Sequence, residues 1–157
     1  MKAIITGSFD PITLGHEDLI RRAARMYESL TVAVCLNPSK ASAFSLEQRL
    51  ALIRRAIDGL DNVEVIVSEG LLAHTCRDLG IDVILRGIRG ASDTDYEIAL
   101  SRINAAAVPG LETVLLPASA ATSHISSSAA REMLRYGGDL TPFLSQAVIE
   151  EIEKIRG

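Results

Sequence analysis

The chain has 157 residues and a net charge of −4, and 48% of its residues are hydrophobic and 23% charged, which fits one soluble domain with a sizeable core. The mildly acidic balance contains no basic block, and only 4% of the residues are aromatic, with no tryptophan. Binding of duplex nucleic acid by charge, or of single strands by base stacking, is therefore not expected.

The start of the chain does not have the pattern of a targeting segment. The first eleven residues, MKAIITGSFDP, hold one lysine and a short apolar run that ends at Asp10. A secretory signal needs a longer apolar stretch, and a membrane helix needs roughly 20 apolar residues. Cys35 and Cys76 match no metal or redox spacing. We expect a cytoplasmic protein with free thiols, no membrane contact and no metal held by its side chains.

Short apolar runs alternate with amphipathic stretches along the whole chain. Strands are predicted at residues 2–6, 30–36, 63–67, 82–86 and 112–116. Helices are predicted to begin near Gly15, Leu46, Leu71, Asp93, Ser127 and Ser145. Ser45 and Gln48 have the spacing of a capping box, and Gly80 is placed to end the helix before it.

This alternation predicts the fold class. Strands that are apolar throughout and separated by helices indicate a parallel sheet covered on both faces. We expect one α/β domain over residues 1–157, a Rossmann-like, doubly wound, parallel five-stranded sheet with helices on both faces. Ligands of such sheets bind at the carboxyl ends of the strands, so the loops after the strands are the place to look for a site.

The first of these loops suits an anion. Gly7 allows a tight turn at the end of the strand, and Gly15 allows a ligand to approach the start of the next helix, whose unpaired N–H groups favour phosphate. Ser8 adds a hydroxyl, and His16 can donate a hydrogen bond while neutral. Taken alone, the segment is equally compatible with a plain strand-to-helix turn.

Two later loops carry cations. Lys40 follows the second strand, where a solvated lysine is the commoner outcome. Arg86 and Arg89 bracket a glycine after the fourth strand, and they favour a forked anion site. A structural ion pair with Asp93, Asp95 or Glu97 is the alternative.

The last segment of interest is a run of serines before a helix. Ser126, Ser127 and Ser128 can cap that helix and also contact phosphate oxygens, and Arg131 follows one turn later. A cap alone explains one serine, so three in a row favour an additional phosphate contact.

These segments together resemble a known family. The residues from Gly7 to His16 are similar to the T/H-x-G-H nucleotidyltransferases, and more closely to the pattern G-S/T-F-D-P-I/V/L-T-x-G-H of bacterial phosphopantetheine adenylyltransferases. Thr13 stands where relatives that act on nicotinate mononucleotide or glycerol phosphate usually carry histidine, which favours the pantetheine branch. The resemblance covers nearly the whole chain, including its length.

The resemblance implies roles for individual residues. It implies that His16, Lys40 and Arg89 are catalytic, and that Ser8, Lys40, Leu72 and Arg86 bind the acceptor. The residues that it places against ATP are Ser8, Phe9, His16, Gly87, Ile88, Arg89, Glu97, Thr122, Ser123, His124, Ile125, Ser126, Ser127 and Ser128.

The resemblance also implies a reaction, in which ATP and 4′-phosphopantetheine give 3′-dephospho-coenzyme A and pyrophosphate. A phosphate monoester has a second pKa near ~6, so this nucleophile needs no general base at neutral pH. Mg²⁺ is the implied cofactor, held mainly by the nucleotide. A homohexamer and feedback binding of coenzyme A are further implications of the family.

The sequence is also compatible with two other functions. An adenylyl- or cytidylyltransferase that acts on another phosphate acceptor, such as nicotinate mononucleotide, is the nearest alternative. A nucleotide-binding protein without chemistry is an alternative of a different class. Release of pyrophosphate with each acceptor in turn would separate these possibilities.

Overall fold

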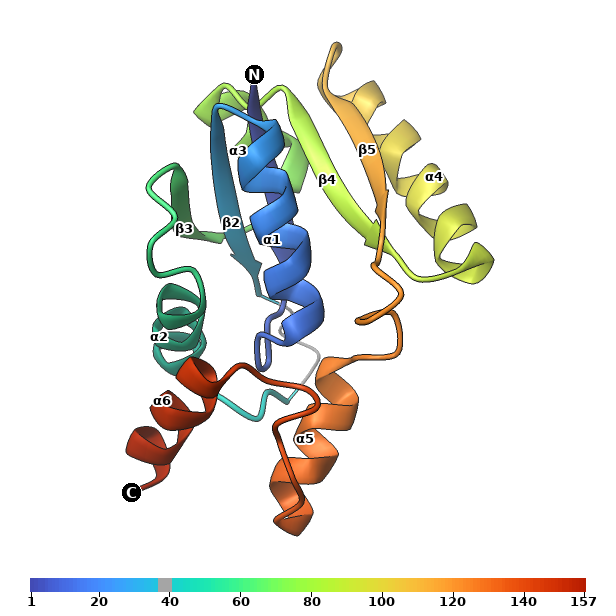
Figure 1. The fold of residues 1–157 in the computed structure, drawn as a ribbon. Helices are drawn as coiled ribbons and strands as arrows, with labels where there is room; N and C mark the ends of the chain where they lie inside the picture. Colours follow the sequence, from blue (N-terminus) through green and yellow to red (C-terminus); the bar gives the residue numbers. More distant parts are fainter. Residues whose placement is uncertain (37–40) are drawn as a thin grey trace.

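A sheet of five parallel strands forms the centre of the computed structural model, which describes residues 1–36 and 41–157 (Figure 1). The strands are β1 (Lys2–Gly7), β2 (Ser29–Cys35), β3 (Val63–Ser68), β4 (Val83–Ile88) and β5 (Glu112–Pro117), and they lie in the order β3-β2-β1-β4-β5. Neighbouring strands pair in parallel throughout. The predicted α/β fold with a five-stranded parallel sheet is confirmed.

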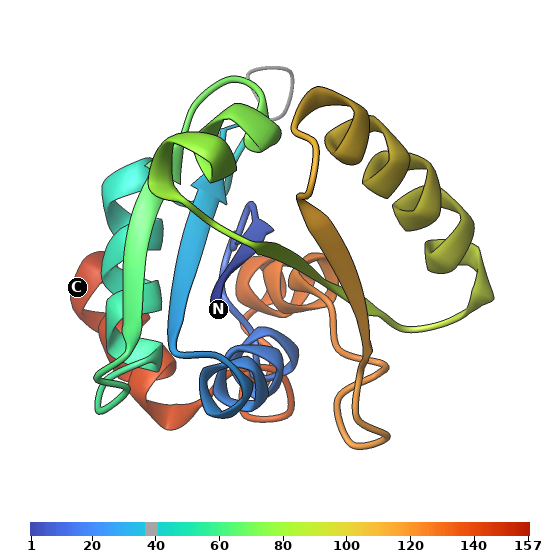
Figure 2. The same ribbon diagram turned by 90° about the horizontal axis from the view of Figure 1, so that it is seen from above.

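Helices cover both faces of this sheet, as Figure 2 shows from above. They are α1 (Leu14–Met26), α2 (Leu46–Ala56), α3 (Leu72–Leu79), α4 (Ala91–Ala107), α5 (Ser127–Tyr136) and α6 (Gln146–Arg156). The larger apolar cluster joins one face of the sheet to α1, α2, α5 and α6, through buried residues such as Ile5, Ile20, Leu52 and Ile152. A smaller cluster on the other face includes Ile4 and Cys76 and is covered by α3.

The predicted helix ends are present as hydrogen bonds. The Ser45 hydroxyl accepts the N–H of Gln48 at 3.2 Å, and the Gln48 side chain accepts the N–H of Ser45 at 2.8 Å, which completes the capping box of α2. Gly80 ends α3 with φ 65°, a left-handed conformation that favours glycine.

The largest difference from the predicted boundaries is at β4. This strand ends at Ile88 and not at residue 86, because Gly87 and Ile88 continue the ladder with Leu116 and Pro117 of β5. The Arg86–Ile88 segment is therefore part of the rigid sheet, and only Arg89 and Gly90 connect it to α4.

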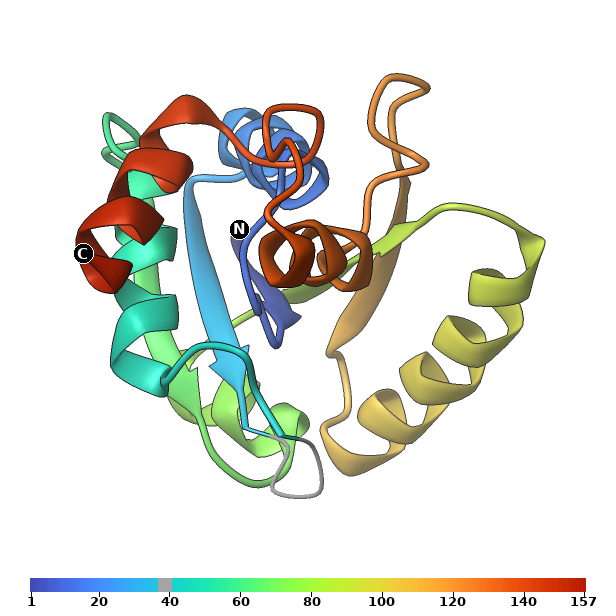
Figure 3. The same cartoon turned by 90° about the horizontal axis from the view of Figure 1, so that it is seen from below.

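The strand order determines where a ligand can bind. The chain proceeds from β1 outward through β2 to β3, and then crosses to β4 and β5 on the other side of β1. Connections therefore diverge at the carboxyl ends of β1 and β4, which is where doubly wound sheets form their ligand crevice. Figure 3 shows the chain from the opposite side to Figure 2, with α5 next to the end of β1. Within the described residues, no helix has the length and apolar character needed to span a bilayer.

Candidate active site

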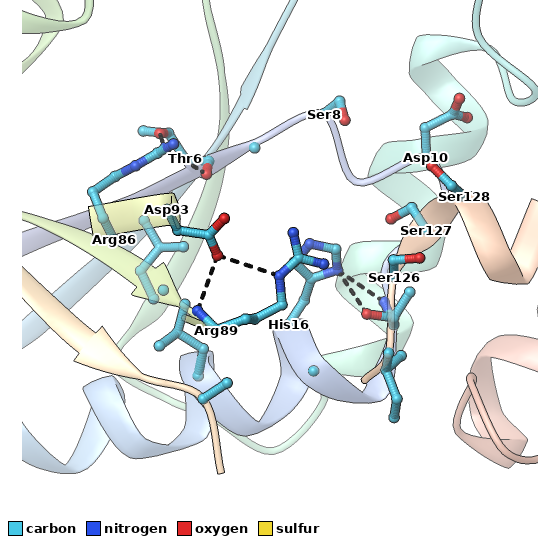
Figure 4. Close-up of a pocket in the computed structure, with 18 of the residues that line it drawn as sticks. Thr6, Ser8, Asp10, His16, Arg86, Arg89, Asp93, Ser126, Ser127 and Ser128 are labelled. Carbon is cyan, nitrogen blue, oxygen red and sulfur yellow. Dashed lines mark hydrogen bonds and ion pairs between the residues drawn. The ribbon is translucent and has the colours of Figure 1, made fainter. Parts of the chain in front are cut away.

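A cavity of about 620 Å³ lies at this divergence point. Its walls come from the ends of β1 and β4, the first turns of α1 and α5, and one side of α2 and α4. Figure 4 shows His16, Arg86 and Arg89 on one side of it and the three serines on the other. Side chains far apart in sequence therefore meet at the edge of the sheet that the fold class predicts.

The loop between β1 and α1 has an unusual backbone conformation at Phe9 and a close contact between Phe9 and Gly7. Phe9 has φ 47°, which is uncommon for a residue other than glycine, and its side chain is fully buried. A Cβ atom on Gly7 would lie 3.2 Å from the Phe9 ring, so glycine allows this close approach. The same ring meets His16 edge to face, with centroids 5.0 Å apart. Phe9 thus packs against the His16 imidazole and helps to fix its position.

His16 has one defined tautomer in this arrangement. Its Nδ1 accepts the backbone N–H of Thr13 at 3.1 Å and lies 3.0 Å from the Thr13 hydroxyl (Figure 4). An N–H group cannot accept, so Nδ1 is unprotonated and the proton of the neutral ring resides on Nε2. Burial, and the nearby positive charge of Arg89, lower the pKa of His16 from 6.5 to about 4. At neutral pH the ring is an uncharged donor.

Arg86 is bound to an acid from α4. Its Nε and Nη2 each donate to the Glu97 carboxylate at 2.8 Å, and its Nη1 donates to the Thr6 hydroxyl at 2.7 Å. Burial acts to lower the pKa of Arg86, but the hydrogen bonds and charge of Glu97 outweigh it and raise that pKa. The ion pair that the sequence offered as an alternative is therefore formed, with Glu97 as the partner.

Arg89 is held more loosely. Its Nε lies 3.5 Å from the Asp93 carboxylate, which also accepts the backbone N–H of Arg89 at 3.0 Å. Its side chain is about half exposed. Arg89 can therefore reorient toward an anion in the cavity at lower cost than Arg86.

The serine run forms the start of α5 and ties it to the first loop. The Ser126 hydroxyl caps the helix by accepting the N–H of Ala129, and the Ser127 hydroxyl donates to the carbonyl of Pro11 at 2.8 Å. The expected helix cap is thus made by the first serine alone. The first turn of α5 faces the cavity with Ser126, Ser127 and Ser128, an arrangement that suits an anion.

Asp10 connects three segments around the cavity. Its buried carboxylate accepts the backbone N–H groups of Ala43 and Phe44, each at 2.9 Å. Its carbonyl oxygen accepts a hydrogen bond from Nη1 of Arg131 at 2.7 Å. Sequence reasoning did not single out Asp10. The one sequence feature that could have drawn attention to Asp10 is its position before a proline in this loop. Its hydrogen-bond partners lie 33 and 34 residues later in the chain, so only the tertiary structure reveals them.

Most of the residues predicted from the sequence lie at this cavity. Those that line it are Ser8, His16, Arg86, Gly87, Arg89, Glu97, Thr122, Ile125, Ser126, Ser127 and Ser128. Those described by the structure but outside the lining are Phe9, Leu72, Ile88, Ser123 and His124. Leu72 packs against the smaller apolar cluster, and Lys40 is outside the described residues. Charge considerations at the sequence level predict that Lys40, Arg86, Arg89 and Arg131 converge at one edge of the sheet, and the three arginines of this set all line the cavity.

Comparison with known proteins gives consistent results. The Cytidylyltransferase-like family matches residues 4–133 of the chain. The phosphopantetheine adenylyltransferase of Psychromonas ingrahamii is 44% identical over 149 residues, which is 94% of this chain and 92% of that protein. The enzyme of the same name from Stenotrophomonas maltophilia is 45% identical over 154 residues, covering 98% and 91% of the two chains.

A solved structure supports the fold alone. The nicotinic acid mononucleotide adenylyltransferase of Plasmodium falciparum, complexed with NaAD, superposes with a TM-score of 0.74. The match covers 98% of this chain and 95% of that one at 18% sequence identity. At that identity the comparison concerns the arrangement of helices and strands.

Proposed function

Because the chain belongs to the Cytidylyltransferase-like family and, within it, to the phosphopantetheine adenylyltransferases, we propose that its cavity transfers the adenylyl group of ATP to 4′-phosphopantetheine. An oxygen of the acceptor phosphate forms a bond to the α-phosphorus, the bond from that phosphorus to the bridging oxygen of the β-phosphate breaks, and pyrophosphate leaves. The products are 3′-dephospho-coenzyme A and pyrophosphate. The structural observation that carries the proposal is the neutral donor His16, held in one tautomer in the wall of a cavity that arginines and serines also line.

The chemistry requires positioning more than proton transfer. The acceptor phosphate is largely dianionic at pH 7, so no base has to remove a proton. The barrier then depends on bringing two anions together in line and on stabilising charge at the α-phosphate. Cationic and N–H donors around the cavity are suited to both tasks.

His16 would act as a hydrogen-bond donor to an α-phosphate oxygen. The backbone N–H of Thr13 donates to Nδ1 and so leaves the ring proton on Nε2, and the low pKa of His16 keeps the ring from titrating near neutrality. The neutral His16 ring therefore remains a hydrogen-bond donor over the physiological range of pH. Arg89, beside the ring, would add positive charge as the oxygen becomes more negative.

The remaining residue roles follow the family resemblance and the geometry around the cavity. We assign Ser8, Lys40, Leu72 and Arg86 to the acceptor. The start of α5 with Ser126, Ser127 and Ser128 is assigned to the nucleotide phosphates. In support, the first turn of α5 and the β1–α1 loop share the cavity wall and are tied together by the bond from Ser127 to Pro11.

Mg²⁺ would be carried by ATP. Magnesium takes octahedral oxygen ligands and is commonly held by one or two carboxylates together with substrate phosphates. Among the described residues, no cluster of three or more potential metal ligands occurs. Following the family resemblance, we assign the ion mainly to the nucleotide phosphates, where it would offset their negative charge.

Three further properties belong to this proposal through the family resemblance. They are assembly into a homohexamer, feedback binding of coenzyme A at the same cavity, and location in the cytoplasm. The free thiols of Cys35 and Cys76 are compatible with a reducing compartment.

The reaction is tested by following pyrophosphate release from ATP with one acceptor at a time. Release with 4′-phosphopantetheine, and little with nicotinate mononucleotide or glycerol 3-phosphate, is the expected result. Equal or greater release with either of the other acceptors would overturn the assignment. ATP binding without pyrophosphate release for any acceptor would indicate a protein that binds nucleotide without catalysis.

A further inference from the structure

Arg49 is a buried cation in the cavity wall that the family pattern did not single out. It lies in the first turns of α2 and is only 6% exposed, yet it contributes to the lining of the cavity. Its Nη1 donates to the carbonyl oxygen of Ser8 at 2.9 Å. Within residues 1–36 and 41–157, its Nε has no hydrogen-bond partner, and no carboxylate oxygen lies within 4 Å of its guanidinium.

This arrangement is unusual for an arginine. Arginine is almost never fully buried unless it is paired, because removing its charge from water is costly. A guanidinium carries five N–H donors, and Arg49 uses one of them on a described residue. Nε is itself buried, so the donors of the two Nη atoms that are not used on Ser8, together with the positive charge, are what a ligand can meet.

The other arginines of the cavity differ in this respect. Glu97 is bonded to Arg86 through both carboxylate oxygens, and Asp93 lies beside Arg89. Arg131 has no carboxylate within 4 Å among the described residues, but it uses two donors, on the Asp10 carbonyl and the Ser128 hydroxyl, and is not buried as Arg49 is. Arg49 thus combines an unneutralised charge with mostly unused donors.

We propose that Arg49 is a phosphate-binding residue of this cavity, whose guanidinium donates to phosphoryl oxygens of the substrates. The bond to Ser8 leaves the guanidinium anchored to the first loop, so the cation is pre-positioned next to the residues that meet the anion. The proposal rests on the proposed function only in naming the ligands, because the chemistry recognised is that of a phosphate group.

Two neutral substitutions, Arg49→Met and Arg49→Gln, remove the charge with similar side-chain length. Arg49→Lys keeps the positive charge but loses the planar guanidinium, which can donate two parallel hydrogen bonds to one phosphate. Arg54→Gln is the matched control, because Arg54 is an exposed arginine of the same helix.

Binding is measured by calorimetry with inorganic pyrophosphate in one arm and 4′-phosphopantetheine in the other, which separates a polyphosphate contact from an acceptor contact. Melting of the ligand-free proteins is recorded in parallel.

The neutral variants are expected to bind at least one of the two ligands about tenfold more weakly or worse, since hydrogen bonds to charged groups are lost. Arg49→Lys should fall between these variants and the wild type, because lysine binds phosphate as a point charge. The ligand-free neutral variants should melt close to the wild type, since a buried charge without a partner does not stabilise the fold. The Arg54→Gln protein should match the wild type throughout.

If Arg49 serves only the stability of the fold, the binding and melting measurements give a different result. If either neutral variant binds both ligands within twofold of the wild type, the proposal is overturned. If neither neutral variant folds while Arg49→Lys folds and binds both ligands like the wild type, the arginine serves the fold and the proposal is likewise overturned. The pyrophosphate arm needs no turnover, so failure of the adenylyl-transfer assignment would be recognised separately, as a wild-type protein that binds pyrophosphate but releases none from ATP.

Discussion

The side chains of Arg86 and Glu97 form a bidentate ion pair in the wall of the cavity, with both hydrogen bonds at 2.8 Å. Arg86 comes from the sheet and Glu97 from α4, and the Glu97 carboxylate is 8% exposed. The pair therefore joins α4 to the sheet at the site itself. An acceptor phosphate bound by Arg86 has to share the guanidinium with Glu97 or displace it.

This pair predicts a coupled effect on stability. Arg86→Ala is expected to lower the free energy of unfolding by about 3–5 kcal/mol, because it leaves a buried carboxylate without its partner. Adding Glu97→Gln to that variant should restore part of the loss, since no buried charge remains. Urea unfolding of the wild type, the two single variants and the double variant forms the test. Additive effects of the two substitutions would contradict the coupling.

The same substitution predicts a kinetic effect. Arg86→Ala should raise the KM for 4′-phosphopantetheine by about tenfold or more, with a smaller effect on the KM for ATP, because a charged hydrogen bond to the acceptor phosphate is lost. Initial rates of pyrophosphate release at varied acceptor concentration measure it. An unchanged KM and kcat for the acceptor would count against the phosphate role of Arg86.

His16 is predicted to act on turnover. His16→Ala removes a donor to the oxygen that gains charge, so kcat should fall by about 10²–10³ while ATP affinity is kept. Pyrophosphate release and ATP titration measure the two quantities. His74→Ala is the control, because His74 is exposed and is not among the residues that line the cavity. Turnover near the wild-type rate in His16→Ala would remove His16 from the catalytic group.

The lowered pKa of His16 predicts a dependence of stability on pH. Between the unfolded value of 6.5 and the folded value of about 4, the unfolded chain binds a proton that the folded protein does not. Stability therefore falls as the pH decreases through this window, by at most about 2 kcal/mol at pH 5 from this residue. Urea unfolding at pH 7 and pH 5 should show a smaller decrease for His16→Ala than for the wild type. Equal decreases would show that His16 does not cause the effect.

Asp10 is predicted to be a positioning residue. Asp10→Ala removes the acceptor of two buried backbone N–H groups, so we expect a loss of about 2–3 kcal/mol in the free energy of unfolding and lower turnover. Asp10→Asn keeps one acceptor oxygen and should recover part of both losses. Asp61→Asn is an exposed control. Turnover and stability of Asp10→Ala at wild-type levels would show that these bonds do not order the cavity wall.

Much of the architecture was predictable from local patterns. The capping box at Ser45 and the left-handed Gly80 depend on neighbours within a few residues, so their outcome could be predicted directly. The place of the cavity followed from the fold class, because parallel strands bring their carboxyl ends to one edge. The end of β4 was predicted two residues early, since pairing of Gly87 and Ile88 with β5 is a long-range interaction.

The contacts within the site were less predictable. The sequence offered three acids as partners of Arg86, and only packing of α4 against the sheet selected Glu97. Arg49 appeared as one arginine of an amphipathic helix, without a motif to distinguish it. Its burial depends on how α2 lies over the first loop.

The acidic composition argued against binding of nucleic acid by charge, and the motifs identified the family, because both are properties of residue type and spacing. The sequence by itself also determined the parallel sheet and the residues that can reach its edge. Only the tertiary structure decided which of the cavity's cations are neutralised. Charge balance depends on distances of a few ångströms between segments that are remote in the chain, and no local pattern specifies those distances.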